Sequence, residues 1–146
     1  MKKIPLMATV LFVLAACNSQ QSNSQTNTDS TTVAAQPAQA VTLLNATDFA
    51  TKLQSEQGML IDVRTPGEYK KGFIKGATLM DIFGDNFDAD LNKLDRNQTY
   101  FVYCAAGGRS AECAEKMQQL GFKKVYDLDG GMGAWRNAGL PVEMPQ

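Results

Sequence analysis

The stretch from Thr99 to Leu120 constrains the fold more than any other part of the chain. Residues 99–103 are mostly apolar and favour a β-strand, and the small-residue segment Cys104-Ala105-Ala106-Gly107-Gly108-Arg109-Ser110 follows them directly. Residues 110–120 then show helical periodicity. A buried strand that passes through a tight loop into a helix is the building unit of parallel α/β sheets. Ligands bind at the carboxyl ends of strands in such sheets, so a thiol is expected at a binding site.

Similar strand and helix patterns flank this unit. The apolar run 59–63 predicts a strand buried on both faces, and Thr65 followed by Pro66 predicts a capped helix start. Further strands are predicted at 41–44, 78–80 and 125–128, and further helices at 45–55, within 81–97 and at 134–137. The glycines of residues 129–133 predict a tight turn. The alternation predicts one α/β domain over residues 41–146, with a parallel sheet and helices on both faces.

The loop after residue 103 has the features of an anion-binding cradle around a reactive thiol. Ala105, Ala106, Gly107 and Gly108 leave the backbone N–H groups uncovered, and such groups attract anions and favour a thiolate. Arg109 adds a permanent charge as an anion clamp or a loop brace, and Ser110 is placed to cap the next helix or to donate a hydrogen bond. Cys104 is therefore predicted to be the nucleophile, with the N–H groups of residues 105–110 as the cradle. The alternative is an inert, buried cysteine at a strand end.

Composition excludes several other kinds of site. The chain contains no histidine, which removes imidazole as a general base and the commonest metal ligand. Its three cysteines form no close-spaced pair, so we expect no metal, and no cofactor is predicted either. The net charge of −1 argues against a nucleic-acid partner.

The N-terminus has the pattern of an export signal. Met1-Lys2-Lys3 is positively charged, and the mostly apolar run 4–13 is too short to span a bilayer but suits a signal peptide. Leu14-Ala15-Ala16-Cys17 resembles the lipobox of bacterial lipoproteins. That resemblance implies cleavage after residue 16, acyl chains on Cys17 and a membrane anchor, whereas the alternative is an ordinary secreted protein.

The segment that follows the lipobox is polar. Residues 18–40 are rich in Ser, Thr, Asn and Gln, which predicts a disordered tether over residues 17–40. The expected location is the bacterial cell envelope, facing the periplasm. Asn18 slightly favours the outer membrane, because aspartate after the lipobox cysteine favours inner-membrane retention in enteric bacteria.

Residues 41–141 resemble a rhodanese domain through three patterns. These are residues 60–69 with Gly72, Ile74, Gly76 and Ala77; the loop 104–110; and Leu128-Asp129-Gly130-Gly131 with Trp135. The chain departs from the family at Phe73, where many members have histidine. We expect this ring to pack under the helix that begins at Pro66.

The resemblance implies sulfur transfer. Rhodanese-like enzymes move a sulfane sulfur from a small anionic donor such as thiosulfate onto the cysteine as a persulfide, and then to cyanide or a thiol. One alternative is a persulfide carrier or anion-binding module that works with a partner protein and does not turn over. Another is a phosphatase of the same fold, whose loop is one residue longer than the four-residue gap between Cys104 and Arg109.

Other candidate residues have structural interpretations that compete with functional ones. Cys113 lies on a helical stripe with Met117 and Leu120, which favours a core position over a resolving thiol. The polar residues Asp62, Arg64 and Glu68 are predicted to brace the site, with substrate contact as the alternative. Tyr103 and Trp135 are predicted to pack rather than to contact substrate.

Overall fold

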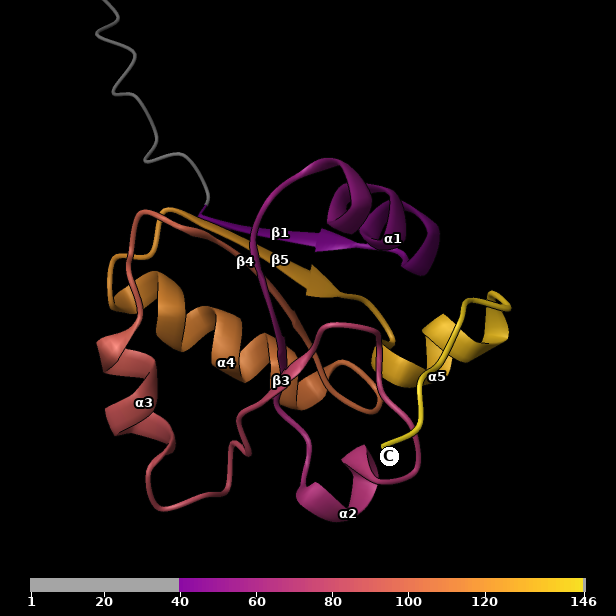
Figure 1. The fold of residues 1–146 in the computed structure, drawn as a ribbon. Coiled ribbons are helices and arrows are strands. Elements are labelled where there is room, and N and C mark those ends of the chain that lie inside the picture. Colours follow the sequence, from indigo (N-terminus) through magenta and orange to yellow (C-terminus); the bar gives the residue numbers. More distant parts are fainter. Residues whose placement is uncertain (1–39, 146) are drawn as a thin grey trace, which may run out of the picture. The chain divides into compact units, whose positions relative to one another are not determined.

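The computed structural model describes residues 40–145 (Figure 1). The predicted signal peptide, Cys17 and the tether up to residue 39 lie outside them. The strands are β1 (Val41–Leu44), β2 (Met59–Asp62), β3 (Thr78–Leu79), β4 (Thr99–Tyr103) and β5 (Lys124–Leu128). The helices are α1 (Ala46–Ser55), α2 (Pro66–Tyr69), α3 (Phe87–Lys93), α4 (Gly108–Gln119) and α5 (Gly131–Asn137).

The five strands form one parallel sheet in the order β1-β5-β4-β2-β3. The central strand β4 is buried from Tyr100 to Tyr103, because it has neighbours on both edges and helices on both faces. In its register, Val102 lies between Ile61 of β2 and Asp127 of β5. The predicted apolar runs are therefore the strands covered on both faces.

Alternate side chains of the strands enter two separate cores. On one face, Val102 of β4 and the following Cys104 pack with residues of α3 and α4, including Leu91 and Met117. On the other face, Phe101 and Tyr103 pack with residues of α1 and α5, among them Phe49 and Trp135. Figure 1 shows α1 on the opposite side of the sheet from α3 and α4. The predicted α/β fold with helices on both faces is confirmed.

Two helices begin earlier than the periodicity indicated. Helix α4 starts at Gly108 rather than Ser110, and α5 starts at Gly131 rather than at residue 134. Gly107 and Gly130 are their N-caps, with φ of +98° and +66°. Glycine adopts this left-handed conformation without steric cost, so the chain enters each helix sooner than the polar pattern suggests. The predicted turn at 129–133 is therefore mostly the first turn of α5, and the strand ends move by one residue at β2, β3 and β5.

The connections reverse direction between β2 and β4. After β2 the chain passes through α2 to β3 on one side, and after β4 it passes through α4 to β5 on the other. Ligands bind at such a switch point, outside the carboxyl ends of the strands. The loops after Asp62 and after Tyr103 meet here, and the Val63 N–H donates to the Tyr103 carbonyl at 3.0 Å.

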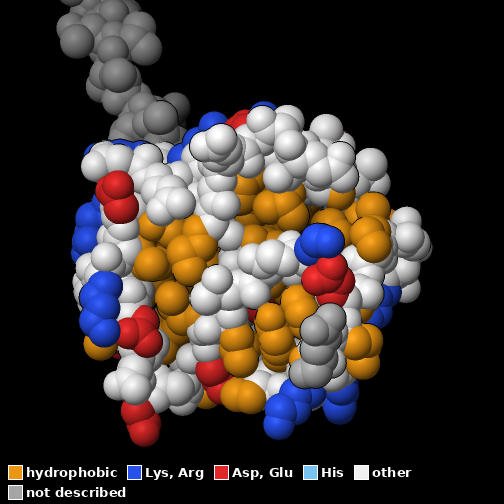
Figure 2. Space-filling view, in the orientation of Figure 1, with side chains coloured by type: hydrophobic (Ala, Val, Ile, Leu, Met, Phe, Trp, Pro, Cys, Tyr) orange, Lys and Arg blue, Asp and Glu red, His pale blue; other side chains and the backbone are white. Residues whose placement is uncertain are grey.

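Charge on the domain surface is mixed. Figure 2 shows Lys and Arg side chains interspersed with Asp and Glu, and hydrophobic side chains exposed among them, over one face. Within residues 40–145, no helix is both long enough and apolar enough to cross a membrane.

Candidate functional site

Cys104 follows the last residue of β4 and lies at the bottom of the loop 104–110. Its side chain is only 1% exposed, and the Gly107 N–H donates to its Sγ at 3.1 Å. Gly107 turns the loop back over the sulfur through its positive φ. One backbone donor of the predicted cradle, the Gly107 N–H, thus contacts the sulfur directly.

Two opposing effects act on the thiol. Burial raises the pKa of Cys104, but the nearby Ser110 hydroxyl and hydrogen bonds from the backbone N–H groups of Ser110, Ala106 and Gly107 lower it. The hydrogen bonds prevail, and the pKa of Cys104 lies below its ordinary value. A lowered pKa increases the thiolate fraction, which is the nucleophilic form.

The prediction that Ser110 caps α4 is wrong. It lies inside the first turns of the helix, fully buried, and its hydroxyl donates to the Gly107 carbonyl at 3.0 Å. No side chain caps α4, whose N-cap is Gly107. The first N–H groups of this helix therefore remain directed at the loop.

Arg109 is held by a carboxylate. Its Nη1 and Nη2 donate to Oε2 and Oε1 of Glu68 at 2.8 and 2.6 Å. The pair joins the start of α4 to α2 across the switch point, 41 residues apart in sequence. The Phe83 ring, which is 69% exposed, lies 5.8 Å from the Arg109 guanidinium carbon. Of the two predicted roles for Arg109, this geometry favours the brace.

Glu68 is itself fixed by the start of α2. It forms a capping box with Thr65, in which the Thr65 N–H and hydroxyl donate to Glu68 Oε2 at 3.1 and 2.9 Å. The hydrogen bond from Arg109 is the main cause that lowers the pKa of Glu68 to about 2. The carboxylate is thus charged over the physiological range and keeps its hold on Arg109.

A second ion pair supports the loop after β2. Arg64 and Asp62 are both buried, and the Arg64 Nε donates to Asp62 Oδ1 at 2.8 Å. The Arg64 Nη2 also donates to the Gly72 carbonyl at 2.9 Å. The predicted polar network of Asp62, Arg64 and Glu68 is present, as two ion pairs that brace the loops rather than one connected cluster.

Helix α5 supports the cysteine loop from the side of β5, which sequence reasoning missed. The N–H groups of Met132 and Gly133 donate to the carbonyls of Cys104 and Ala105 at 2.8 and 3.0 Å. A Cβ on Gly131 would collide with the Cys104 carbonyl oxygen. The Gly130-Gly131 pair was the available signal, because paired glycines indicate a close approach of backbone as well as a turn.

The remaining candidate residues have packing roles. Cys113 is fully buried in the core under α4, and burial raises its pKa to about 12, which does not suit a resolving thiol. The Tyr103 hydroxyl accepts from the Ile74 N–H at 3.1 Å, and the Trp135 Nε1 donates to the Pro141 carbonyl at 2.9 Å. Phe73 stacks on Tyr69 of α2 with 4.3 Å between the ring centroids, as predicted.

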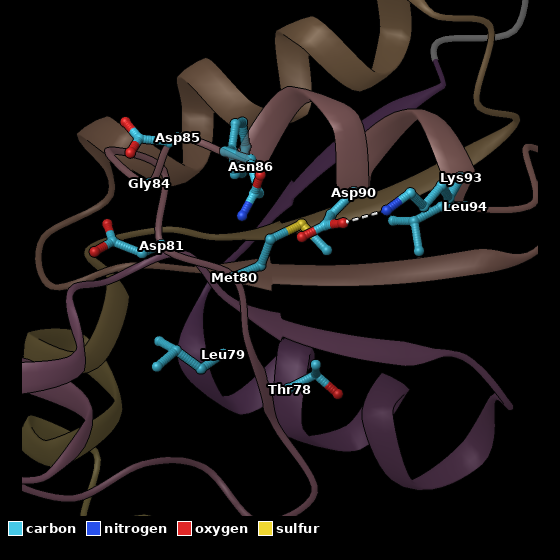
Figure 3. Close-up of a pocket in the computed structure, with 11 residues that line it drawn as sticks. Thr78, Leu79, Met80, Asp81, Gly84, Asp85, Asn86, Asp90, Lys93 and Leu94 are labelled. Carbon is cyan, nitrogen blue, oxygen red and sulfur yellow. Dashed lines mark hydrogen bonds and ion pairs between the residues drawn. The ribbon is translucent and has the colours of Figure 1, made fainter.

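Two cavities differ in their position and charge. One, of about 480 Å³, lies beside β3 and α3, where Asp81, Asp85 and Asp90 contribute carboxylates and Lys93 donates to Asp90 at 2.8 Å (Figure 3). The other, of about 210 Å³, adjoins the cysteine loop. We call it the Ala105 pocket, and it is lined by Arg64, Glu68, Lys71, Ala105, Met132, Gly133 and Arg136. Within residues 40–145, no three His, Cys, Asp or Glu side chains are placed to hold a metal ion.

The arrangement suits nucleophilic attack by sulfur on a small electrophile. The thiol has a lowered pKa, the Ser110 hydroxyl and backbone N–H donors lie around it, and the loop carries only small side chains between Cys104 and Arg109. Fixed donors of this kind stabilise negative charge without reorganisation as it develops.

Comparison with known proteins agrees with this geometry. A family model described as "Rhodanese-like domain" matches residues 45–138. A sulfurtransferase from Allochromatium vinosum is 29% identical over 92 residues, which cover 63% of this chain and 84% of that protein.

Solved structures of rhodanese-like proteins have the same fold. A rhodanese-related protein from Thermoplasma volcanium is 31% identical, with a TM-score of 0.62 over 70% of this chain and 97% of that one. A rhodanese-like domain protein from Staphylococcus aureus is 30% identical, with a TM-score of 0.61 over 71% of this chain and 98% of that one. The chain belongs to the rhodanese-like domain family.

Proposed function

We propose that the protein is a sulfurtransferase of the bacterial envelope that carries sulfane sulfur as a persulfide on Cys104. The donor is a small sulfur-containing anion such as thiosulfate, and the acceptor is a thiol or cyanide. Membership of the rhodanese-like family and similarity to a sulfurtransferase support the reaction class. The lipobox pattern that ends at Cys17 supports the lipid anchor and the envelope location.

The observation that carries the proposal is the environment of the Cys104 sulfur. A thiol that is 1% exposed would ordinarily be hard to ionise, yet the Ser110 hydroxyl and the loop N–H groups lower its pKa. The Gly107 N–H donates to this sulfur at 3.1 Å, and fixed donors of this kind would stabilise the charge of a persulfide. A buried structural cysteine such as Cys113 has neither feature, since its pKa rises to about 12.

The proposed half-reactions need no redox partner. The Cys104 thiolate attacks the outer sulfur of thiosulfate, the donor S–S bond breaks, and its electron pair leaves with sulfite. A nucleophilic acceptor then attacks the outer sulfur of the persulfide, and the Cys104 thiolate is regenerated. Negative charge passes through the loop in both steps, where the backbone N–H groups stabilise it.

Arg109 acts as a brace in this scheme. Its two Nη groups each donate a hydrogen bond to the Glu68 carboxylate, at 2.6 and 2.8 Å. The four-residue gap between Cys104 and Arg109, one residue shorter than in phosphatase loops, argues against the phosphatase alternative. A persulfide carrier without broad turnover would use the same cradle, and only acceptor kinetics distinguish it from an enzyme.

The test is sulfur loading followed by intact mass measurement. Incubating the full-length chain with thiosulfate should add the mass of one sulfur atom, and peptide mapping should locate it at Cys104. The Cys104→Ala variant should gain no sulfur. Cys113→Ala is the matched control, because it removes a buried thiol outside the loop and should load like the wild type.

Loading of Cys104→Ala, or loss of loading only in Cys113→Ala, would refute the assignment. Turnover of the loaded chain with cyanide and with small thiols then separates an enzyme from a carrier module. Release of sulfur to either acceptor over many cycles supports the enzyme. A single discharge without further cycles supports the carrier.

A further inference from the structure

The Ala105 pocket begins one residue away from the reactive cysteine. Ala105 follows Cys104 directly, so its Cα lies about 3.8 Å from that of the cysteine. Met132, which is 2% exposed, lines the pocket, and its N–H is bonded to the Cys104 carbonyl. Cys104 itself does not line the pocket, so a donor bound there would reach the sulfur past the backbone of Ala105.

The pocket carries an excess of positive charge. Two of its charged side chains are already neutralised, since Arg64 pairs with Asp62 and Glu68 pairs with Arg109. Lys71 and Arg136 form no ion pair with any carboxylate of residues 40–145. Two cationic residues without an ion pair thus line a cavity of about 210 Å³ beside the loop.

Arg136 is oriented without being neutralised. Its Nη2 donates to the backbone carbonyl of Lys71 at 3.0 Å, which ties α5 to the end of α2. A carbonyl oxygen fixes the position of the guanidinium and leaves its charge and its other N–H groups available. An arginine held in this way is suited to bind a planar carboxylate through two hydrogen bonds.

We propose that Lys71 and Arg136 form a subsite for the carboxylate of a small organic persulfide. This inference rests on the proposed function, because it names the substrate class of the same site. Thiosulfate lacks such a carboxylate and would fill only the loop. A donor with a carboxylate a few bonds from its sulfane sulfur would use the loop and the Ala105 pocket together.

The transfer from such a donor is balanced. The Cys104 thiolate attacks the outer sulfur of R–S–SH, the donor S–S bond breaks, and its electron pair leaves with R–S⁻. The proton stays on the transferred sulfur, which becomes the outer sulfur of the Cys104 persulfide. No oxidant or reductant is required.

The larger cavity beside α3 does not compete for this ligand. Asp81, Asp85 and Asp90 line it, and Lys93 is paired with Asp90 (Figure 3). Its net charge is negative, so an anionic donor would be repelled there. The two cavities therefore carry net charges of opposite sign, and the positively charged one adjoins the cysteine loop.

The test compares two donors that differ only in the carboxylate. The persulfide of N-acetylcysteine carries it, and the persulfide of N-acetylcysteine amide does not. For the first donor, Lys71→Gln and Arg136→Gln should each raise the apparent KM about tenfold, as loss of one charge-assisted hydrogen bond implies. For the amide donor and for thiosulfate, KM should change by no more than about twofold.

Lys70→Gln is the matched control. Lys70 is an exposed neighbour that does not line the pocket, so its removal changes the net charge equally and should leave KM unchanged. Equal increases in KM for the acid and the amide donor would overturn the subsite. Equal increases in KM in all three variants would also overturn it. No change in Lys71→Gln and Arg136→Gln would also overturn it.

A binding measurement separates this inference from the proposed function. In the Cys104→Ala chain, N-acetylcysteine should shift the amide NMR signals of Ala105 and Gly133, and Arg136→Gln should abolish the shift. Loading of Cys104 without this binding would refute the subsite and leave the sulfurtransferase proposal standing. Binding of N-acetylcysteine without loading by any donor would refute the sulfurtransferase proposal and leave the carboxylate subsite standing.

Discussion

At the scale of single residues, the field at Cys104 comes from the Ser110 hydroxyl and the backbone N–H groups rather than from a free cation. Arg109 is the only charged residue of the loop, and Glu68 neutralises it at 2.6 Å. Helix α4 has no side-chain cap, so its first N–H groups stay free of competing side-chain acceptors. A capping Ser110 would have occupied one of these donors. Its actual place inside the helix keeps the donors available to sulfur.

The Glu68–Arg109 pair gives the loop a pH-dependent stability. The pKa of Glu68 is about 2 in the folded chain against an ordinary value of 4.5, so its contribution is complete above pH 4.5 and is lost as the pH falls through about 2. Glu68→Gln should lower the free energy of unfolding by about 1 kcal/mol at neutral pH, because the pair is only partly buried. Urea unfolding of both chains at neutral pH and below pH 4.5 measures this loss of stability.

The difference in the free energy of unfolding between the wild type and Glu68→Gln should narrow as the pH falls. Glu112→Gln is the control, since Glu112 is exposed and forms no ion pair within residues 40–145. A deficit in Glu68→Gln that stays constant from neutral pH to about pH 3 would contradict the ion-pair account.

Asp127 is a buried carboxyl that the proposed reaction does not use. It is 2% exposed, and its Oδ1 has no hydrogen-bond partner in the described part of the chain. Burial raises the pKa of Asp127, an effect that the Ser110 hydroxyl offsets only in part. The folded state therefore holds the proton more tightly than the unfolded chain does. The destabilisation of the fold by the buried Asp127 carboxylate is absent below the ordinary pKa of 3.8 and complete above the raised pKa.

Asp127→Asn should consequently stabilise the domain at neutral pH by about 1 kcal/mol. The gain should vanish below the ordinary carboxyl pKa, where both chains are neutral at this position. Thermal unfolding as a function of pH checks it, with Asp85→Asn as an exposed control. A loss of stability at neutral pH would show that the carboxylate makes a favourable interaction when charged.

At the scale of elements, the site is a junction of three helix starts. Helix α2 supplies Glu68, α4 follows the cysteine, and α5 bonds the Cys104 and Ala105 carbonyls. All three follow strands of one parallel sheet and therefore meet at its carboxyl edge. The position of the loop depends on how closely α5 approaches it, which requires glycine at residue 131.

Gly131→Ala should displace the cysteine loop. The new Cβ would collide with the Cys104 carbonyl oxygen and lie 2.9 Å from the Ala105 carbonyl carbon and the Ala106 nitrogen. Its φ of +53° is also unfavourable for alanine, so we expect a loss of about 1–3 kcal/mol. The rate of sulfur loading should fall by about tenfold or more, as misplacement of a reacting group implies.

Gly139→Ala isolates the backbone contribution. Gly139 has a φ of +69°, but a Cβ there would meet nothing within 4 Å. This control should lose stability and keep its loading rate. If Gly131→Ala and Gly139→Ala behave alike in both measurements, close approach of α5 is not what positions the loop.

Much of this junction could be predicted from sequence, because the relevant signals are local. The apolar run before Cys104, the Thr65-Pro66 start of α2 and the small loop residues each act within a few positions. The partner of Arg109 could not be predicted, since it lies 41 residues away and depends on strand order. The early starts of α4 and α5 were missed because left-handed glycines at residues 107 and 130 are indistinguishable from turn glycines in sequence.

At the scale of the whole molecule, the chain combines a described domain with an N-terminal pattern of a different kind. Residues 45–138 match the rhodanese-like family, while a lipoprotein signal is predicted for residues 1–17 from their resemblance to a lipobox sequence. If Cys17 is acylated, the lipid determines where sulfur is delivered and Cys104 determines how. The two cysteines would then have separable functions, which a pair of substitutions can test.

Cys17→Ala should release the protein from the membrane without affecting sulfur loading. Two or three acyl chains are needed for stable anchoring, and Cys17 is the residue that would carry them. In bacteria grown with a palmitate analogue, the wild type should be labelled and recovered with membranes, whereas Cys17→Ala should be unlabelled. Asn18→Ala keeps the Leu14-Ala15-Ala16-Cys17 pattern and should behave like the wild type in labelling. Palmitate labelling of Cys17→Ala would place the lipid elsewhere, and loss of Cys104 loading in that variant would show that anchor and site are coupled rather than separable.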